Sequence, residues 1–246
     1  MKNSNLLLMV FLLFLFSMTF LICEHITVTS FLVDKVIYQK NESLSGLKLV
    51  AFTFDDGPSI TTEKLLDELK MRNVKATFFV LGEKCEKFPL ILKKIADDGH
   101  QVGVHSYNHR NFYGLNIAQL DFQVNSTVNI IKKITGKVPN ILRPSYGNVS
   151  KNIKKVSSLP IILWSIDTKD WKIKSPKRLF ENNIDKIGDG DIVLFHDIFE
   201  SSIDGALMLI DALKKRNFIF VTIDEIAFLK NRPLNKSEVY FNFFDN

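Results

Sequence analysis

The sequence predicts an α/β fold built from parallel βαβ units, and three observations lead to that prediction. Short apolar runs alternate with amphipathic segments along the 246-residue chain, as they do in βαβ folds. No internal repeat interrupts this alternation. Polar residues suited to chemistry follow the apolar runs, namely Asp55, Asp56, His105, Arg143, Asp167 and His196. Because active sites of α/β barrels lie at the carboxyl ends of the strands, we expect these residues to share one site.

The individual elements follow from the spacing of apolar residues and from the residues that end each run. Leucines at helical spacing, with charges between them, predict the helix at 62–72. Gly99 and Gly136 end the helices before them. In chain order we expect strands at 49–54, 76–81, 102–104, 141–143, 161–166, 191–195 and 218–222, and helices at 62–72, 89–98, 117–135, 176–187 and 204–216.

The composition is that of an ordinary globular domain, with 46% hydrophobic and 24% charged residues. The net charge of +5 comes from scattered lysines rather than from a run. This pattern favours a solvated surface over nucleic-acid binding, so no nucleic-acid partner is expected. The two cysteines, Cys23 and Cys85, exclude a disulfide framework.

Residues 6–22 are almost wholly apolar and follow Lys2, as in a secretory signal with a basic start. No small-x-small cleavage site follows, and the run is barely long enough to span a membrane, so an uncleaved anchor remains the alternative. In both cases we expect the domain to be secreted or to lie at the extracellular face of the membrane. We divide the chain into a signal peptide or anchor (1–23), an N-terminal extension with a candidate edge strand at 26–38 (24–46), the main domain (47–229) and a C-terminal tail (230–246).

The most informative motif is TFDDGP at 53–58, in which two adjacent carboxylates end an apolar strand. The chain is already turning at the last residue of a strand, so Asp55 and Asp56 can both reach one cleft. One of them can bind a metal while the other stays free as a base. Acids in such a position are costly unless they are paired or metal-bound. Asp-Gly-Pro is also good turn chemistry, so a simple turn is the alternative.

A second motif, HSYNH, places His105 and His109 four residues apart, just after the expected strand at 102–104. On a helix or helical turn, this spacing puts both imidazoles on one face, where they can hold Zn²⁺ or a similar cation. The glutamate of an HExxH protease motif is missing, and two unrelated surface histidines are the alternative. Together with one Asp, the pair would form a three-ligand site with open positions for water and substrate.

Taken together, the motifs resemble the polysaccharide deacetylases of carbohydrate esterase family 4, the NodB-homology domain, over about residues 47–229. Five motifs occur in the order of that family: TFDDGP at 53–58, HSYNH at 105–109, RPSYG at 143–147, DTKDW at 167–171 and LFH at 194–196. The resemblance implies a distorted (β/α) barrel of seven to eight strands, which is the NodB-type deacetylase fold.

The resemblance also implies the roles of the residues nearest the chemistry. Asp56, His105 and His109 look like the ligands of a divalent metal, with Zn²⁺ as the first choice and Co²⁺ or another divalent ion as the alternative. Asp55 looks like the general base, and His196 looks like the general acid that protonates the leaving amine. A base and an acid in one site need surroundings that push their pKa values apart.

Two further residues would support the base. In the resemblance, Arg143 would hold Asp55 in place, and Asp170 would in turn hold Arg143. An ordinary buried ion pair is the alternative interpretation of an arginine and an aspartate in such motifs.

Other positions would face the substrate. Tyr146 would offer its backbone amide to the reacting oxygen and could stack on a sugar, while Trp171 and Leu194 would line the pocket for the acetyl methyl group. Core packing is the alternative for side chains of these two types. Ser145 stands where the family usually has a second proline. Because proline lowers the entropy of an unfolded loop, serine is expected to leave a looser loop and to affect substrate preference rather than catalysis.

The sequence therefore predicts a metal-dependent polysaccharide deacetylase. Its expected partner and substrate is a polymer containing N-acetylglucosamine, such as peptidoglycan, chitin or a chitooligosaccharide, from which it would release acetate. A noncatalytic carbohydrate-binding relative and an O-acetyl xylan esterase are the alternatives. The presence of Asp55, His109 and His196 favours an enzyme over a binding module. We expect a monomer, with residues 6–22 as the candidate membrane anchor.

Overall fold

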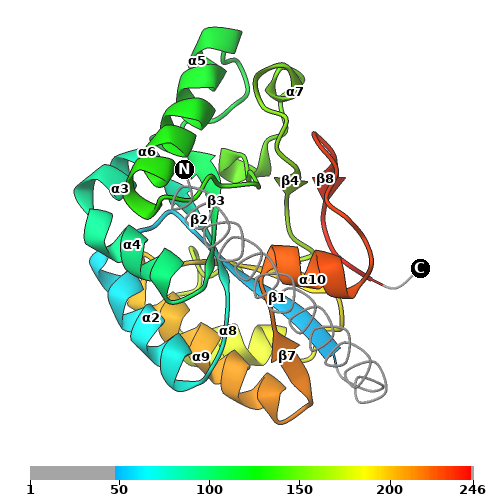
Figure 1. The fold of residues 1–246 in the computed structure, drawn as a ribbon. Helices are drawn as coiled ribbons and strands as arrows, with labels where there is room; N and C mark the ends of the chain where they lie inside the picture. The colour runs from blue at the N-terminus through cyan, green and yellow to red at the C-terminus, as the bar shows by residue number, and fades with distance from the viewer. Residues whose placement is uncertain (1–47, 245–246) are drawn as a thin grey trace, which may run out of the picture. The chain divides into compact units, whose positions relative to one another are not determined.

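In the computed structural model, which describes residues 48–244, a parallel sheet forms the centre of the fold (Figure 1). The strands run in the order β3 (Gln101–Ser106), β2 (Thr77–Leu81), β1 (Lys48–Asp55), β6 (Asp191–His196) and β5 (Ile166–Asp167), and β7 (Phe218–Phe220) pairs with the first half of β1. All of these strand pairs are parallel, as the alternation of elements predicts.

Isolated bridges extend this sheet into a ring. Leu142 bridges Val104 of β3 on one side and Ile161 on the other. Ile161 opens β4 (Ile161–Ile162), which pairs in parallel with β8 (Val239–Tyr240). After β8, Asn242 forms an antiparallel bridge to the first residue of β6. The predicted distorted (β/α) barrel is thus confirmed, and single-residue bridges close its weakest part.

Helices lie around the strands (Figure 1). They are α2 (Ile60–Met71), α3 (Gly82–Lys87), α4 (Pro89–Asp97), α5 (Ile117–Asp121), α6 (Thr127–Thr135), α7 (Ile153–Val156), α8 (Pro176–Asn183), α9 (Glu200–Lys214) and α10 (Ile223–Leu229), with a π-helical turn η1 (Phe122–Ser126) and a 3₁₀ turn η2 (Ser145–Gly147). Helix α9 packs against α8 and α2, and α4 packs against α2 and α6. Among residues 48–244, no helix has the length and apolar character needed to cross a membrane.

Strand β1 shows how the sequence divides the buried side chains between two layers. Its even-numbered residues from 50 to 54 belong to the large cluster that contains the buried leucines of α2 and α9. Leu49 and Ala51 belong to a second cluster, with residues of β4, β6 and α10. Because side chains alternate along a strand, Asp55 lies on the face of Leu49 and Ala51, opposite the face that packs against α2 and α9.

Two of the predicted elements are broken in the structure. The strand expected at 161–166 splits into β4 and β5 because it changes partners. The backbone N–H of Leu163 donates to Tyr240 of β8 at 2.8 Å, whereas that of Ser165 donates to Ile192 of β6 at 3.0 Å. The helix expected at 117–135 is interrupted by η1, and such π-helical turns often occur at functional sites.

The C-terminal segment is part of the folded domain. The segment 230–246, predicted as a tail, contributes β8, and the fully buried Phe243 packs in the second cluster. The predicted signal peptide or anchor (1–23) and the extension (24–46), with its candidate edge strand, lie outside the described residues.

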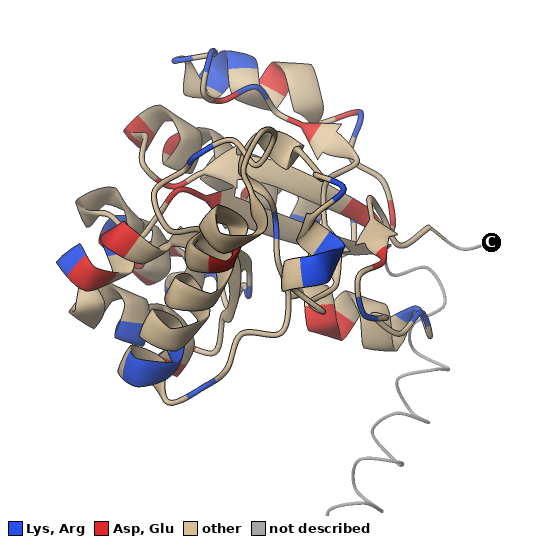
Figure 2. Ribbon diagram, turned by 90° about the horizontal axis from the view of Figure 1, so that it is seen from above, with Lys and Arg blue, Asp and Glu red and all other residues tan. Residues whose placement is uncertain are grey.

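Residues of both charges alternate along the outer helices (Figure 2). Helix α4 is an example, since Lys93 and Asp97 form an i,i+4 ion pair at 2.8 Å. Such exposed pairs contribute little to stability, so the charge pattern serves mainly to keep the surface solvated.

Candidate active site

The two adjacent carboxylates of the TFDDGP motif reach one cavity because the chain turns between them. Asp55 is the last residue of β1, whereas Asp56 has a left-handed backbone with φ of 74°. The turn also requires a glycine next, because a Cβ on Gly57 would lie 2.3 Å from Oδ2 of the buried Asp197. The motif is therefore both a turn and a site, and the turn is what directs Asp56.

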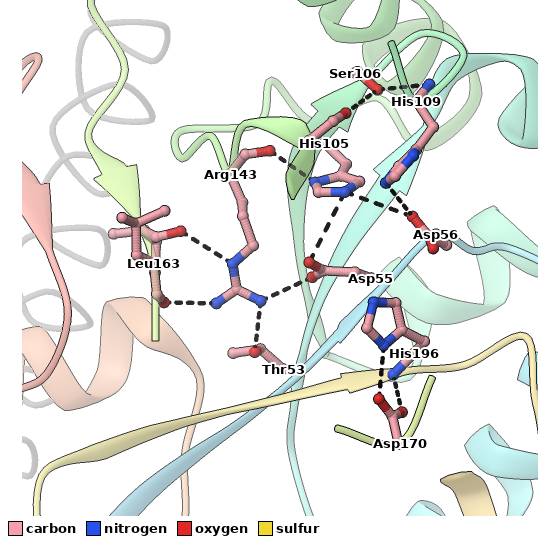
Figure 3. Close-up of polar contacts among 12 residues, drawn as sticks. Thr53, Asp55, Asp56, His105, Ser106, His109, Arg143, Leu163, Asp170 and His196 are labelled. Carbon is pink, nitrogen blue, oxygen red and sulfur yellow. Dashed lines mark hydrogen bonds and ion pairs between the residues drawn. The ribbon is translucent and has the colours of Figure 1, made fainter. Parts of the chain in front are cut away.

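Asp56, His105 and His109 converge on a common point (Figure 3). Nε2 of His105 lies 3.5 Å from Oδ1 of Asp56, and Nε2 of His109 lies 3.3 Å from the same oxygen. The three potential ligand atoms lie within 4.8 Å of one another. Oδ1 of Asp56 is buried and has no hydrogen-bond partner among the described residues. Since such an oxygen is costly to bury, the three residues fit a divalent cation, which would satisfy it.

The two histidines do not lie on a helix, which differs from the prediction made from their spacing. His105 belongs to β3, and His109 lies in the following loop with a left-handed φ of 58°. Side chains fold this loop instead. Oγ of Ser106 accepts from the backbone N–H of His109 at 2.9 Å. Oε1 of Gln123, in η1, accepts from the backbone N–H groups of residues 107 and 108 at 3.0 and 3.3 Å.

Hydrogen bonding and burial prepare both imidazoles for a cation. Nδ1 of His105 lies 2.7 Å from the carbonyl oxygen of Arg143. A carbonyl oxygen only accepts, so this nitrogen carries a proton, and Nε2 is the nitrogen directed at the point shared with Asp56 and His109. Burial lowers the pKa of His109, although the charge of Asp56 opposes this effect. The neutral imidazole is the form that binds metals.

A fully buried guanidinium holds Asp55 (Figure 3). Nη1 of Arg143 donates to Oδ1 of Asp55 and to Oγ1 of Thr53, both at 2.8 Å. Nε donates to the carbonyl of Ile162 at 3.0 Å, and Nη2 donates to that of Leu163 at 2.8 Å. Burial lowers the pKa of Arg143, and the charge of Asp55 opposes that shift. The arginine thus binds Oδ1 and leaves Oδ2 of Asp55 on the cavity side, 3.9 Å from Nε2 of His105.

Asp170 contacts His196 rather than Arg143, so the predicted pairing of Asp170 with Arg143 is wrong. Oδ1 of Asp170 lies 2.8 Å from Nδ1 of His196, and Oδ2 accepts from the backbone N–H of His196 at 2.6 Å. The reason is geometric, because the guanidinium nitrogens of Arg143 are directed at Asp55, Thr53 and two backbone carbonyls on the other side of the site.

His196 carries a proton at neutral pH. Burial alone would lower its pKa, but the hydrogen bond and charge of Asp170, with the charges of Asp55 and Asp56, outweigh burial and raise the pKa to about 9. His196 is paired with Asp55 in the register of neighbouring strands β6 and β1. A carboxylate and a protonated imidazole therefore stand next to each other, as a base and an acid of one reaction require.

A cavity of about 520 Å³ opens over these side chains. The predicted site residues all line it except Arg143 and Asp170, which are fully buried behind its wall. Leu194 is nearly buried, whereas Trp171 and Tyr146 are exposed over half of their surface. The depth of the cavity is thus apolar at Leu194, and its mouth has two aromatic faces.

Sequence reasoning missed two aromatic residues of this cavity, Trp164 and Phe199. Trp164 lies against Gly147, where a Cβ would come within 2.8 Å of the indole. Gly147 also has a φ of 66°, so glycine is needed there twice over. Nζ of Lys174 lies 3.1 Å from the centre of the Phe199 ring. Both aromatic residues lie close to strand ends, which is the only sequence signal that could have marked them.

Sequence reasoning also missed Asp197, which anchors the start of α2 beside the site. Its Oδ2 accepts from Oγ1 of Thr62 at 2.6 Å, and its carbonyl accepts from Oγ1 of Thr61 at 2.6 Å. Burial raises the pKa of Asp197 to about 7, although the hydrogen bond from Thr62 opposes the shift. The signal was its place directly after a motif histidine.

Known proteins share both the sequence and the fold of this chain. The profile of the polysaccharide deacetylase family matches residues 45–160. The peptidoglycan-N-acetylglucosamine deacetylase of Bacillus cereus is 40% identical over 182 residues, which cover 71% of this chain and 66% of that protein. The peptidoglycan-N-acetylglucosamine deacetylase PgdA of Listeria monocytogenes is 38% identical over 200 residues, or 81% of this chain. This chain spans only 42% of the length of PgdA.

The fold is also shared with a solved structure that contains a metal ion. A family 4 acetyl xylan esterase from Clostridium thermocellum, in complex with a cobalt ion, superposes on this chain with a TM-score of 0.75. The two are 30% identical, and the match covers 79% of this chain and 98% of the esterase chain.

Proposed function

This chain belongs to the polysaccharide deacetylase family, and from that premise we propose that it hydrolyses the N-acetyl groups of N-acetylglucosamine residues in peptidoglycan and releases acetate. Peptidoglycan is proposed ahead of chitin and chitooligosaccharides because the two relatives described above are peptidoglycan-N-acetylglucosamine deacetylases. The observation that carries the activity is that one cavity holds a free carboxylate, a three-ligand cluster and a protonated imidazole, provided by Asp55, by Asp56, His105 and His109, and by His196.

The proposed cofactor is a divalent cation held by Asp56, His105 and His109. Two imidazole nitrogens and one carboxylate oxygen suit Zn²⁺ and leave a position open, and the cobalt complex of the esterase relative supports Co²⁺ as an alternative. When bound, such a cation lowers the pKa of water and polarises the acetyl carbonyl.

The side chains of this protein would supply the proton transfers. Oδ2 of Asp55 would accept a proton from the attacking water, since Oδ1 is engaged by Arg143. His196 would donate the proton on Nε2 to the leaving amine, because Asp170 keeps the other proton on Nδ1. Tyr146 would offer its backbone N–H to the oxyanion, and this role stays a prediction.

Acetate release is the test of this proposal. The metal-free protein, the protein restored with Zn²⁺ and the Asp55→Asn variant are each incubated with peptidoglycan, chitin oligomers and acetylated xylan. We expect acetate from peptidoglycan that disappears with chelator and returns with Zn²⁺. Binding to glycan without acetate release in any sample would instead indicate a noncatalytic carbohydrate-binding relative.

An O-acetyl xylan esterase is the second candidate, and the esterase neighbour is the observation that favours it. Leaving groups distinguish the two, because an amine departs only with a proton whereas a sugar alkoxide has less need of one. The raised pKa of His196 therefore supports amide hydrolysis. A His196→Ala variant that loses acetate release from N-acetyl substrates far more than from acetylated xylan would agree with this assignment.

We also propose that the protein acts outside the cytoplasm, secreted or anchored at the extracellular face, and that it is a monomer. The support for the location is the apolar run at 6–22 after Lys2. Cell fractionation with N-terminal sequencing tests the location, and analytical ultracentrifugation of the purified protein tests the oligomeric state. Recovery of the uncleaved chain in the cytosol would contradict the first proposal.

A further inference from the structure

We propose that Ser145 is a positioning residue for the metal ligand His109. Ser145 stands where the family resemblance leads us to expect a second proline, and its side chain is fully buried. Its Oγ donates to Oγ of Ser106 at 2.9 Å. The hydroxyl therefore has a defined partner next to the metal cluster, where a proline would have none to offer.

Ser106 carries the effect onward to His109. Its Oγ, also fully buried, accepts from the backbone N–H of His109 at 2.9 Å (Figure 3). A serine oxygen can accept two hydrogen bonds, so Ser106 can accept from both Ser145 and His109. The two buried hydroxyls thus form a short chain that ends on the backbone of His109.

His109 needs such support because of its backbone conformation. Its φ of 58° is uncommon for a residue with a Cβ, yet this conformation brings Nε2 to 3.3 Å from Oδ1 of Asp56. The hydrogen bond from its N–H to Ser106 stabilises that geometry, and Ser145 restricts the rotamer of Ser106. Substitution of residues that orient metal ligands in this way typically lowers metal affinity by about 10- to 100-fold.

The backbone alone does not explain why serine occupies this position. Pro144 has φ of −62° and ψ of 142°, which is the conformation favoured before a proline. A proline at 145 would therefore suit the preceding residue, so the feature that serine adds is its hydroxyl.

Metal affinity provides the test, which rests on the proposed metal dependence. Co²⁺ binding is followed by its absorption spectrum, and Zn²⁺ binding by competition with a chromophoric chelator. The proteins are wild type, Ser145→Ala, Ser106→Ala, the double variant and Ser150→Ala. Ser150 is a matched control, since its buried hydroxyl has no hydrogen-bond partner among residues 48–244.

We expect Ser145→Ala to lower the affinities for Co²⁺ and Zn²⁺ by about tenfold and Ser150→Ala to leave both affinities unchanged. In the Ser106→Ala background, Ser145→Ala is expected to cause no further loss, because the two hydroxyls act as a unit. Unchanged affinity in Ser145→Ala, or an equal loss in both backgrounds, overturns the proposal. A lower Tm of the metal-free Ser145→Ala protein with unchanged affinity assigns Ser145 to packing and overturns it too. If the wild-type protein itself binds neither ion, the proposed metal site is wrong. This result differs from one in which wild type binds the ions and Ser145→Ala binds them equally well.

Discussion

Asp170 binds His196 through both oxygens of its carboxylate, one 2.8 Å from Nδ1 and the other 2.6 Å from the backbone nitrogen. Asp170 is fully buried, so this charge-assisted pair is shielded from solvent. Asp55, at the end of the neighbouring strand β1, is held by Arg143, and both of these residues are also buried. Two separate ion pairs therefore stabilise the acid His196 and the base Asp55. Because the pairs share no residue, one of them can be removed by mutation while the other stays intact.

Replacing Asp170 with Asn is expected to lower the pKa of His196, because the amide keeps the geometry of the side chain but removes its charge. The acid must be protonated, so wild-type kcat/KM falls as pH rises through about 9, and the variant loses activity at a lower pH. At its optimum we expect a loss of about 10²- to 10⁴-fold. A pH profile of kcat/KM, with an NMR titration of metal-free protein, checks this. An unmoved alkaline limb would count against the acid role of His196.

The same pair makes stability depend on pH. The pKa of His196 in the folded protein lies above its ordinary value of 6.5, so the stabilisation is fully present below that value and is lost as pH rises through about 9. Urea unfolding of the metal-free protein at several pH values between these limits measures the loss. Asp170→Asn, in which the shift is reduced, is expected to show a flatter dependence.

Asp55→Asn and Asp56→Asn are both expected to lose activity, but for different reasons. Both are expected to lose at least about 10²-fold in kcat, since one removes the base and the other a ligand. Only Asp56→Asn should lose bound metal, because Asp56 belongs to the three-residue cluster and Asp55 is engaged by Arg143. Metal content by mass spectrometry separates the two. Equal metal loss in both variants would show that Asp55 is also a ligand.

Arg143→Met is expected to destabilise the protein by about 3–5 kcal/mol, because it leaves the buried carboxylate of Asp55 without its partner. Arg216→Met is a suitable control, since the ion pair of Arg216 with Asp185 is largely exposed and is expected to contribute about 0–1 kcal/mol. The free energy of unfolding in urea gives both values. Similar losses in the two variants would mean that burial does not set the strength of the Arg143 pair.

Gly57→Ala is expected to cost about 1–3 kcal/mol and to lower activity, because its Cβ would lie 2.3 Å from the buried carboxylate of Asp197 and would displace the turn that holds Asp56. Gly188→Ala offers a matched control, since its Cβ would meet only Oδ2 of Asp191 at an ordinary 3.5 Å. Thermal unfolding and acetate release are measured for both. Wild-type behaviour of Gly57→Ala would refute the close approach of Asp197.

Much of the fold and of the site could be predicted from local patterns. The apolar runs of β1, β2 and β6 are continuous because these strands are buried on both faces, and such runs are visible without knowledge of their neighbours. The candidate catalytic residues lie at or directly after the carboxyl ends of these strands. Parallel strands align their carboxyl ends, so Asp55 and His196 come together although 140 residues separate them.

The partners of individual atoms could not be predicted in the same way. Asp170 was assigned to Arg143, but packing places it under His196. The strand at 161–166 breaks because its carbonyl and amide groups are divided between β8, β6 and the guanidinium of Arg143. The sequence predicts a looser loop at Ser145, whereas in the fold its hydroxyl donates to Oγ of Ser106.

The sequence by itself determined the alternation of the central strands with the main helices, the carboxyl-end position of the reactive residues and the family to which the chain belongs. Only the tertiary structure decided which donor meets which acceptor, and so which side chains hold the base, the acid and His109. The physical reason is that periodicity depends on neighbours along the chain. A hydrogen bond instead requires atoms within about 3 Å and in line, and this is decided by how distant strands pack together.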